Sequence, residues 1–261
     1  MELREFITDT ARGAGEIILS HYGQIKTKHA KEGRGDIVTE VDIESESYVI
    51  RRIKEEFPNH SIVSEESGKA GTPDTGYTWY IDPLDGTRNY ALGIPFFCVS
   101  IALAKDGVAE YGVIFDPLHN ELFYAAKGQG AMLNSRLIKV SGEIDLEDSV
   151  ITVSWLRSRT AYSKFANYIE RISSNTSYFR RFGSAALVSA YVAAGRVDAY
   201  MQGAINPWDI AAGTLIIEEA GGIVTDFEGR PIDLRKPYID ILAATPVIHE
   251  KIMRKVLGIK G

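Results

Sequence analysis

The string Asp82-Pro83-Leu84-Asp85-Gly86-Thr87 follows an apolar segment, residues 77–81, that has the composition of a buried strand. Two carboxylates three positions apart, with a proline between them and a glycine after them, can point into one small volume. Their oxygens, and the carbonyl of Leu84, suit a hard cation such as Mg²⁺. The amides of Gly86 and Thr87 would begin a helix, where backbone donors favour a phosphate. The string therefore predicts a metal and phosphate site, although Asp-Pro and Asp-Gly are also common turn dipeptides.

An Asp-x-Asp-Gly-Thr string is also typical of haloacid-dehalogenase phosphatases. In those enzymes the nucleophilic aspartate stands two residues before the second aspartate. That position is Pro83 here, and proline has no carboxylate. The spacing excludes this class of phosphatase.

Further acidic strings occur where predicted strands end or predicted helices begin: Asp36-Ile37-Val38-Thr39-Glu40-Val41-Asp42, Ser64-Glu65-Glu66-Ser67 and Asn206-Pro207-Trp208-Asp209. Each has an ordinary structural explanation. The first resembles a capping box, the second suits a solvated strand end, and the third suits a helix with an N-cap and a proline at its first position. Taken one at a time, these strings leave the structural and the functional interpretation open.

The hydrophobic pattern changes along the chain. Residues 1–22 and 39–57 have the period of helices, and residues 97–140 have the alternation and turn clusters of an antiparallel meander. After about residue 145, strands predicted near 149–154, 176–182, 197–201, 222–225 and 239–244 alternate with helices predicted near 160–173, 184–194, 208–220 and 246–257. We therefore expect residues 1–145 to form an α+β half with an antiparallel sheet and the metal-binding motifs. Residues 146–261 would form an α/β half that completes the active site in a cleft between the two.

Composition narrows the functional classes. The chain has 261 residues, 45% of them apolar and 25% charged, with a formal net charge of −6. This balance gives no basis for the basic face of a nucleic-acid-binding protein. Cys98 is the only cysteine, which excludes an internal disulfide and a cysteine-rich zinc site. No apolar run approaches the roughly 18–20 residues of a membrane span, and we expect a cytoplasmic enzyme.

In their order and their joint occurrence, the four acidic strings resemble those of the inositol monophosphatase superfamily, which are lithium-sensitive, magnesium-dependent phosphatases. The resemblance spans nearly the whole chain. It includes Gly183-Ser184-Ala185-Ala186, Trp208-Asp209-Ile210-Ala211-Ala212-Gly213 and Glu219-Ala220-Gly221-Gly222. It implies a layered α+β and α/β fold, the alternating αβαβα sandwich of the sugar phosphatases. It also implies a homodimer that acts on a small sugar or polyol phosphate, without nucleic acid or membrane.

The resemblance assigns roles to individual residues. It implies two or three Mg²⁺ ions, held by Glu65, Asp82, the carbonyl of Leu84, Asp85 and Asp209. The expected reaction is attack on phosphorus by a metal-activated water, which Glu65 and Thr87 orient while Asp42 accepts a hydrogen bond from Thr87. The segment before Asp36 corresponds to the family's mobile loop.

The substrate residues that the resemblance and the charge pattern imply are Asp85, Gly86, Thr87, Arg180, Arg181, Gly183, Ser184, Ala185, Gln202 and Asp209. Two positions depart from the inositol-preferring animal enzymes. Gln202 stands where those enzymes have a glutamate that binds ring hydroxyls, and Asn206 stands where a histidine is usual. These departures fit the archaeal and microbial members, several of which also hydrolyse fructose 1,6-bisphosphate.

We therefore expect a magnesium-dependent phosphomonoesterase acting on inositol 1-phosphate and on fructose 1,6-bisphosphate. The alternatives are a dedicated fructose-1,6-bisphosphatase, a histidinol phosphatase, a 3′,5′-bisphosphate nucleotidase and a non-catalytic regulator that binds sugar phosphate.

Overall fold

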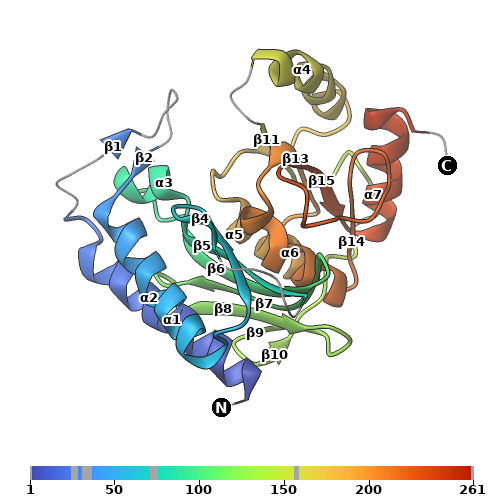
Figure 1. Cartoon of the computed structure of the whole chain (residues 1–261). Coiled ribbons are helices and arrows are strands. Elements are labelled where there is room, and N and C mark those ends of the chain that lie inside the picture. The colour runs from blue at the N-terminus through green and yellow to red at the C-terminus, as the bar shows by residue number, and fades with distance from the viewer. Residues whose placement is uncertain (1, 25–28, 31–36, 71–75, 156–158, 260–261) are drawn as a thin grey trace.

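The computed structural model describes residues 2–24, 29–30, 37–70, 76–155 and 159–259. Helices and sheets alternate in five layers (Figure 1). Helices α1 (Leu3–His21) and α2 (Glu40–Glu56) cover one face of a large sheet. Helices α5 (Ala185–Ala193) and α6 (Pro207–Glu219) lie between its other face and a smaller sheet. Helices α4 (Arg159–Ser173) and α7 (Pro246–Ile252) cover the outer face of the smaller sheet. The predicted αβαβα sandwich is confirmed.

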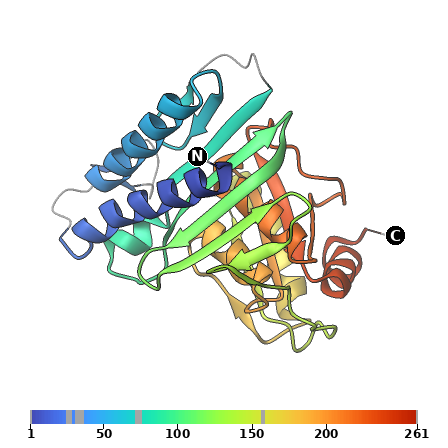
Figure 2. The ribbon, with the colours of Figure 1, turned by 90° about the horizontal axis from the view of Figure 1, so that it is seen from below.

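The first layer forms because two amphipathic helices turn their apolar sides to the large sheet. In α1 (Leu3–His21), the residues at three- and four-residue steps, among them Phe6, Ala14 and Ile18, are buried. Helix α2 (Glu40–Glu56) begins after Thr39, which forms a capping box with Asp42. Figure 2 shows the two helices side by side against the strands.

Within the described residues, the large sheet has eight strands in the order β10-β9-β8-β7-β6-β5-β3-β4. Neighbouring strands are antiparallel, except that β3 and β5 are parallel. The strands are β3 Ser61–Ser64, β4 Gly68–Ala70, β5 Tyr77–Asp85, β6 Cys98–Lys105, β7 Val108–Asp116, β8 Glu121–Ala126, β9 Ala131–Leu133 and β10 Arg136–Leu137. A separate antiparallel pair consists of β1 His29–Ala30 and β2 Ile37–Val38.

The smaller sheet has five strands among the described residues, in the order β12-β11-β13-β15-β14. Strand β11 is parallel to β12 and β13, whereas β15 is antiparallel to β13 and β14. Its strands are β11 Ile151–Trp155, β12 Phe179–Arg180, β13 Ala199–Ile205, β14 Ile223–Thr225 and β15 Ile239–Ala244. The remaining helices are α3 Thr87–Ala91, α4 Arg159–Ser173, α5 Ala185–Ala193, α6 Pro207–Glu219 and α7 Pro246–Ile252.

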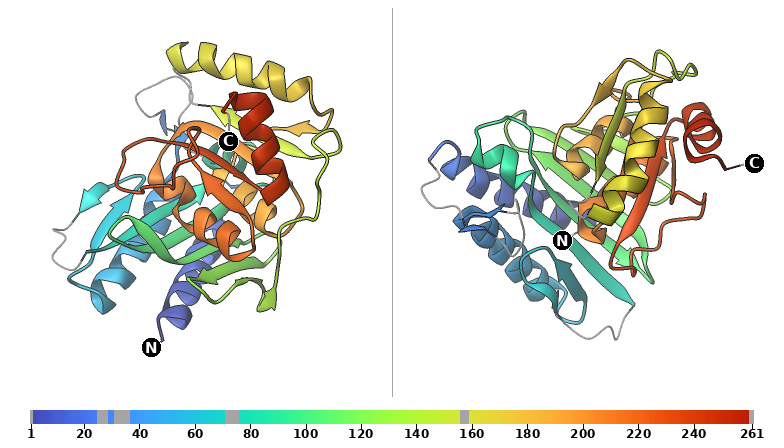
Figure 3. Two further views of the ribbon diagram at one scale, coloured as in Figure 1. Left: turned by 90° about the vertical axis from the view of Figure 1, so that its right-hand side faces the viewer. Right: turned by 90° about the horizontal axis from the view of Figure 1, so that it is seen from above.

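The two middle helices are apolar on nearly all sides, because they are buried against both sheets. Their buried residues belong to one core cluster that includes Tyr80 and Ile114 of the large sheet and Tyr200 and Ile241 of the smaller one. A second cluster lies under α1 and α2, and a third lies between the smaller sheet and α4 with α7. Both views in Figure 3 show α4 and α7 next to each other on that outer face.

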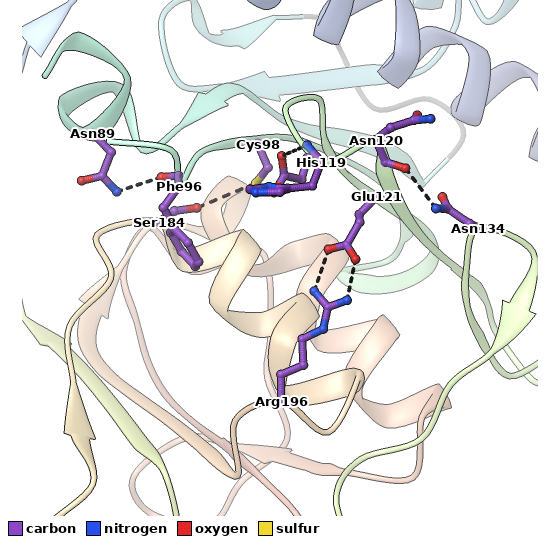
Figure 4. Close-up of polar contacts among 10 residues, drawn as sticks. Asn89, Phe96, Cys98, His119, Asn120, Glu121, Asn134, Ser184 and Arg196 are labelled. Atoms are coloured by element: carbon purple, nitrogen blue, oxygen red, sulfur yellow. Dashed lines mark hydrogen bonds and ion pairs between the residues drawn. The ribbon is translucent and has the colours of Figure 1, made fainter. Parts of the chain in front are cut away.

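An ion pair also joins segments from the two halves. Arg196, after α5, donates two hydrogen bonds of 2.5 and 2.6 Å to the carboxylate of Glu121 on β8 (Figure 4). The guanidinium of Arg196 also lies 4.7 Å from the ring centre of Tyr191. Because core and ion pair both cross residue 145, the division into 1–145 and 146–261 describes a change of pattern. As a domain boundary it stays a prediction.

Three predicted elements differ from the structure. Strand β5 does not end at residue 81 but continues through Pro83 to Asp85. The strand expected at 176–182 is only two residues long, because the chain leaves the sheet edge after Arg180. The helix expected at 246–257 is α-helical to Ile252 and continues as a π-helix over Met253–Leu257. Among the described residues, no helix combines the length and apolarity needed to cross a bilayer.

Candidate metal and phosphate site

Three aspartates converge where β5 ends and α6 begins. One carboxylate oxygen from each of Asp82, Asp85 and Asp209 lies within 4.8 Å of the others. The side chains of the first two are nearly removed from solvent, with 1% and 7% of their surface exposed. Asp85 and Asp209 are 124 positions apart in the sequence. The fold therefore brings the string 82–87 and the string 206–209 to one place.

A local irregularity in β5 turns both of its aspartates toward the site. The pairing of β5 with β6 shifts register between Asp82 and Asp85. The loop between them is fixed at both ends, because Leu84 N donates to Asp82 Oδ1 at 3.1 Å and Ser45 Oγ donates to the carbonyl of Pro83 at 3.0 Å. Gly86 then takes a φ of 95°, and a Cβ there would lie 2.9 Å from the carbonyl oxygen of Phe96. Only glycine fits this turn without strain.

The N-terminus of α5 holds Asp85 from the other side of the site. Its Oδ2 accepts hydrogen bonds from Ser184 Oγ at 2.5 Å and from the amide of Ala186 at 2.6 Å. The thiol of Cys98 lies 3.8 Å from the same oxygen and from Ser184 Oγ (Figure 4). Burial, with smaller contributions from Asp85 and Asp82, raises the pKa of this thiol well above its usual value. Cys98 is therefore a neutral packing residue here.

The electrostatics of the cluster favour a bound cation. Burial, and then the charges of Glu65, Asp85 and Asp209, raise the pKa of Asp82 well above 3.8. The pKa of Asp209 is raised in the same way, first by burial and then by Glu65 and Asp85. A hydrogen bond between Asp82 and Asp209 requires a proton on one of them. A divalent cation removes both the repulsion and the need for that proton, so this all-oxygen donor set fits Mg²⁺.

Glu65 lies near this cluster but outside the group of three. It follows β3, and its amide donates to the carbonyl of Ile81 at 3.2 Å. Its charge raises the pKa of both Asp82 and Asp209. Its neighbours in sequence are held separately, because the amides of Glu66 and Ser67 each donate to Glu46 Oε1 at 3.1 Å. The backbone on both sides of Glu65 is therefore held by hydrogen bonds, and this positions Glu65 near the cluster.

Thr87 connects the cluster to α2. Its Oγ1 donates to Asp42 Oδ1 at 2.9 Å and lies 3.0 Å from the carbonyl oxygen of Leu84. Asp42 is fully buried, and burial raises its pKa even though Thr39 and Thr87 donate to it. The carbonyl of Leu84 therefore lies beside the Thr87 hydroxyl.

A cavity of about 180 Å³ opens beside Asp85 and Asp209. Seven of the predicted substrate residues line it: Asp85, Arg181, Gly183, Ser184, Ala185, Gln202 and Asp209. Arg180 is not among the lining residues, and its guanidinium instead donates to the carbonyl of Phe179 at 2.8 Å. Of the two arginines that the sequence left open, Arg181 is the one at the cavity.

Two residues that shape this cavity, Tyr200 and Asn89, were not predicted from the sequence. Tyr200 donates from its hydroxyl to Gln202 Oε1 at 2.6 Å, which leaves the amide nitrogen of Gln202 as a donor. Tyr200 and Gln202 are two residues apart on β13, and side chains at that spacing lie on the same face of a strand. This spacing is the sequence signal that could have placed Tyr200 beside Gln202. Asn89 donates from Nδ2 to the carbonyls of Phe96 and Phe182, both at 2.8 Å, and so fixes the segment before Gly183. Nothing local to Asn89 in the sequence indicates that contact.

The predicted residues that the structure places around the cluster and cavity are Asp42, Glu65, Asp82, Leu84, Asp85, Thr87, Arg181, Gly183, Ser184, Ala185, Gln202 and Asp209. Gly86 forms the turn between Asp85 and Thr87. Asn206 lies just outside as the N-cap of α6, where its amide donates to Asp209 Oδ2 at 3.2 Å. Asp36 and most of the expected mobile loop before it lie outside the described residues.

Comparison with known proteins identifies relatives over the full length. The model of the inositol monophosphatase family matches residues 1–260. A protein of Pasteurella multocida named Nus factor SuhB is 41% identical over 249 residues, 94% of this chain and 92% of its own. An inositol-1-monophosphatase of Synechocystis is 39% identical over 253 residues, 95% of this chain and 86% of its own. The crystal structure of the suppressor protein SuhB from Bartonella henselae superposes with a TM-score of 0.92 at 35% identity, over 98% of both chains.

Proposed function

Because this chain belongs to the inositol monophosphatase family, we propose that it is a magnesium-dependent phosphomonoesterase that hydrolyses inositol 1-phosphate. The observation that carries the proposal is the meeting of Asp82, Asp85 and Asp209 beside a cavity of polyol size. Buried carboxylates that repel one another are costly in a purely structural role. A site that binds divalent cations and an anionic substrate explains why all three are present.

In this proposal, Mg²⁺ is held by the carboxylates of Glu65, Asp82, Asp85 and Asp209 and by the carbonyl of Leu84, with two or three ions per site. Bound Mg²⁺ supplies positive charge for a phosphoryl oxygen and lowers the pKa of a water. The same charge explains how a chain with a net charge of −6 accepts a phosphate ester at an acidic cluster.

The chain's own groups orient the attacking water. The one hydrogen of the Thr87 hydroxyl has two acceptors within reach, Asp42 Oδ1 at 2.9 Å and the Leu84 carbonyl at 3.0 Å, and Oγ1 keeps lone pairs that can accept a hydrogen bond from the water. Glu65 belongs to another of the acidic strings, Ser64-Glu65-Glu66-Ser67. In this proposal its carboxylate accepts the second hydrogen of a water placed between Glu65 and Thr87. This arrangement contributes through general-base and orientation effects, which are typically worth about 10²–10⁴-fold in rate.

The polyol lies in the cavity lined by Gly183, Ser184, Ala185 and Gln202, with the phosphate toward Gly86 and Thr87. Gly183 has a φ of 87°, and a Cβ there would lie 3.2 Å from Asn89 Nδ2. Glycine is therefore favoured here by the positive φ and by the close approach of Asn89, which together fix the segment that lines the cavity. Fixed backbone and a small cavity favour a compact substrate over a nucleotide.

A second substrate, fructose 1,6-bisphosphate, is favoured by one specific contact. Tyr200 donates to the side-chain oxygen of Gln202, and the amide nitrogen of Gln202 and the guanidinium of Arg181 are two of the donor groups that line that part of the cavity. Donors there suit a second phosphate, to which a guanidinium can bind in a bidentate manner. A glutamate at position 202 would instead repel it.

A kinetic comparison of four substrates tests these proposals. Phosphate release from inositol 1-phosphate, fructose 1,6-bisphosphate, adenosine 3′,5′-bisphosphate and histidinol phosphate is measured at equal Mg²⁺. We expect turnover of the first two and little of the other two. Turnover of fructose 1,6-bisphosphate alone would identify a dedicated fructose-1,6-bisphosphatase, and hydrolysis of histidinol phosphate alone a histidinol phosphatase. No release from any of them, with sugar phosphate still bound, would favour the non-catalytic regulator, a role compatible with relatives named Nus factor.

The remaining expectations from the sequence stay predictions. They are a cytoplasmic location, a homodimer, inhibition by lithium and the absence of nucleic-acid binding. Gel filtration with light scattering checks the oligomer. Titration with lithium in the phosphate-release assay checks the inhibition.

A further inference from the structure

A second cavity, of about 680 Å³, lies between the β3–β5 edge of the large sheet and the first turn of α6. The two cavities share no lining residue among those described. The second one is bounded by β3, β4 and β5 of the large sheet, the turn at Asp106 and Gly107, the first residues of α6 and the segment 234–238. Its volume is within the range of sites that hold a small organic ligand, about 300–1,000 Å³.

The wall of this cavity is aromatic and firmly held. Tyr80 is 4% exposed, and its hydroxyl donates to the carbonyl of Leu234 at 3.0 Å. That bond ties the 234–238 segment to β5. Pro207 and Trp208 line the cavity from the first turn of α6. The partly exposed ring of Trp208 is the aromatic surface against which a flat apolar ring can pack.

The rim of the cavity carries an excess of positive charge. Lys69, Arg235 and Lys236 line it, against one acidic lining residue, Asp106. The guanidinium of Arg235 forms two 2.9 Å hydrogen bonds to Asp233, which offset its charge. The two lysines remain as the cations that an anionic group of a ligand would meet, and this contrasts with the acidic net charge of the chain.

Trp208 adds one hydrogen-bond donor. Its indole Nε1 is buried and has no acceptor among the described residues. A buried donor without a partner is destabilising, and most such groups in folded proteins find one. A small rotation of the ring, which already lines the cavity, would present this N–H to an oxygen of the ligand.

We propose that this cavity is a binding site for a planar aromatic anion, with the ring against Trp208 and the anionic group toward Lys69 and Lys236. The proposal does not depend on the phosphatase assignment, because no lining residue of this cavity is among the proposed metal ligands. Its wall is nevertheless continuous with the metal cluster. Tyr80 stands two residues before Asp82, and Trp208 stands immediately before Asp209.

The test uses 2-naphthoate as the probe, with isothermal titration calorimetry on the full chain in excess chelator. Without divalent cations, the acidic cluster has no means of attracting a carboxylate. We expect one saturable site with a Kd of about 1 mM or tighter. Neutral 2-naphthalenemethanol and the non-aromatic cyclohexanecarboxylate should each bind at least about tenfold more weakly, since each lacks one of the two recognised features.

Variants locate the site. Lys236→Ala and Trp208→Phe should each weaken binding of 2-naphthoate by about fivefold or more. Lys54→Ala, which removes an exposed lysine on α2, is the matched control and should not change it. No saturable binding, equal binding by Lys236→Ala, or weakening by Gln202→Ala in the substrate cavity would each overturn the proposal. Lys236 is exposed, so that variant keeps the test decisive even where Trp208→Phe does not fold.

Discussion

The hydroxyl of Thr87 and the hydroxyl of Thr39 donate to different oxygens of one carboxylate, that of Asp42. Thr87 Oγ1 lies 2.9 Å from Oδ1, and Thr39 Oγ1 lies 2.5 Å from Oδ2. From the sequence, capping of α2 and orientation of Thr87 are competing interpretations of Asp42. In the structure they are compatible, because a carboxylate has two oxygens and each takes one role.

This division allows the two roles to be separated by mutation. Thr87→Ala should lower kcat by about a hundredfold or more, because the water-orienting hydroxyl is lost. Its melting temperature should stay close to that of the wild type. Thr87→Ser, which keeps the hydroxyl, should recover most of the rate in a phosphate-release assay.

The matched control is Thr39→Ala, which removes the hydroxyl's bond to the other oxygen and leaves the backbone amide of residue 39 bonded there at 2.8 Å. It should cost about 0.5–2 kcal/mol of unfolding free energy, as the loss of an N-cap does. Its kcat per folded molecule should change little. If Thr39→Ala and Thr87→Ala instead lose stability and rate to the same extent, Asp42 has only a structural role.

The buried aspartates predict a pH dependence of stability in the metal-free chain. The folded-state pKa values of Asp82 and Asp209 are raised above 3.8. Their contribution to stability is therefore fully present below about pH 4 and is lost as the pH rises through the raised values. Asp82→Asn removes one of these carboxylates and its repulsion of the others. In excess chelator, its melting temperature should exceed that of the wild type, by a margin that grows with pH.

Mg²⁺ should reverse this order. The wild type binds the cation and is stabilised by mass action, whereas Asp82→Asn has lost a ligand. A change of 1 kcal/mol in the free energy of unfolding shifts the melting temperature by roughly 2–4 °C in a chain of this size. Differential scanning fluorimetry from pH 5 to pH 8 therefore resolves the reversal in the order of the two melting temperatures. A margin that shrinks with pH in chelator would contradict the electrostatic account.

The contact between Tyr200 and Gln202 predicts how substrate choice changes. Gln202→Glu places a negative charge near the second phosphate of a bisphosphate. At about 6 Å and an effective dielectric near 20, one such charge pair costs roughly 3 kcal/mol, about a hundredfold in binding. Hydrolysis of fructose 1,6-bisphosphate should therefore fall far more than hydrolysis of inositol 1-phosphate.

Two arginine variants provide the comparison. Arg181→Ala should selectively impair the bisphosphate, since Arg181 lines the cavity. Arg180→Ala should leave the ratio of the two kcat/KM values unchanged, since its guanidinium is bound to its own strand. An equal effect of Gln202→Glu on both substrates would remove the charge argument and leave the inositol phosphate assignment in place.

The layered fold and the positions of the metal-binding strings could be predicted because they depend on local pattern. Helix α6 begins at Pro207, one residue from its predicted start, because Asn206, Pro207 and Asp209 are residue types that favour the cap, the first position and the first turn of a helix. Strand β15 has its predicted bounds, residues 239–244, because its apolar residues are followed directly by Thr245 and Pro246, where a helix begins.

Features that depend on distant contacts could not be predicted. The continuation of β5 through Pro83 is stabilised by Ser45, on a helix that precedes it by 38 residues. The choice between Arg180 and Arg181 depends on which way the chain turns as it leaves β12. The anchoring of Asp85 by Ser184 joins residues 99 apart, and no local pattern contains that information.

The most direct test of the central claim is phosphate release from inositol 1-phosphate by the wild type and by Asp82→Asn, each with Mg²⁺ and with excess chelator. We predict activity in the wild type with Mg²⁺ and a loss of at least about a thousandfold, roughly 4 kcal/mol of barrier, in the other three samples. Circular dichroism establishes that Asp82→Asn is folded. Full turnover by the wild type in chelator, or near-normal turnover by folded Asp82→Asn with Mg²⁺, would contradict a metal-dependent reaction at this cluster.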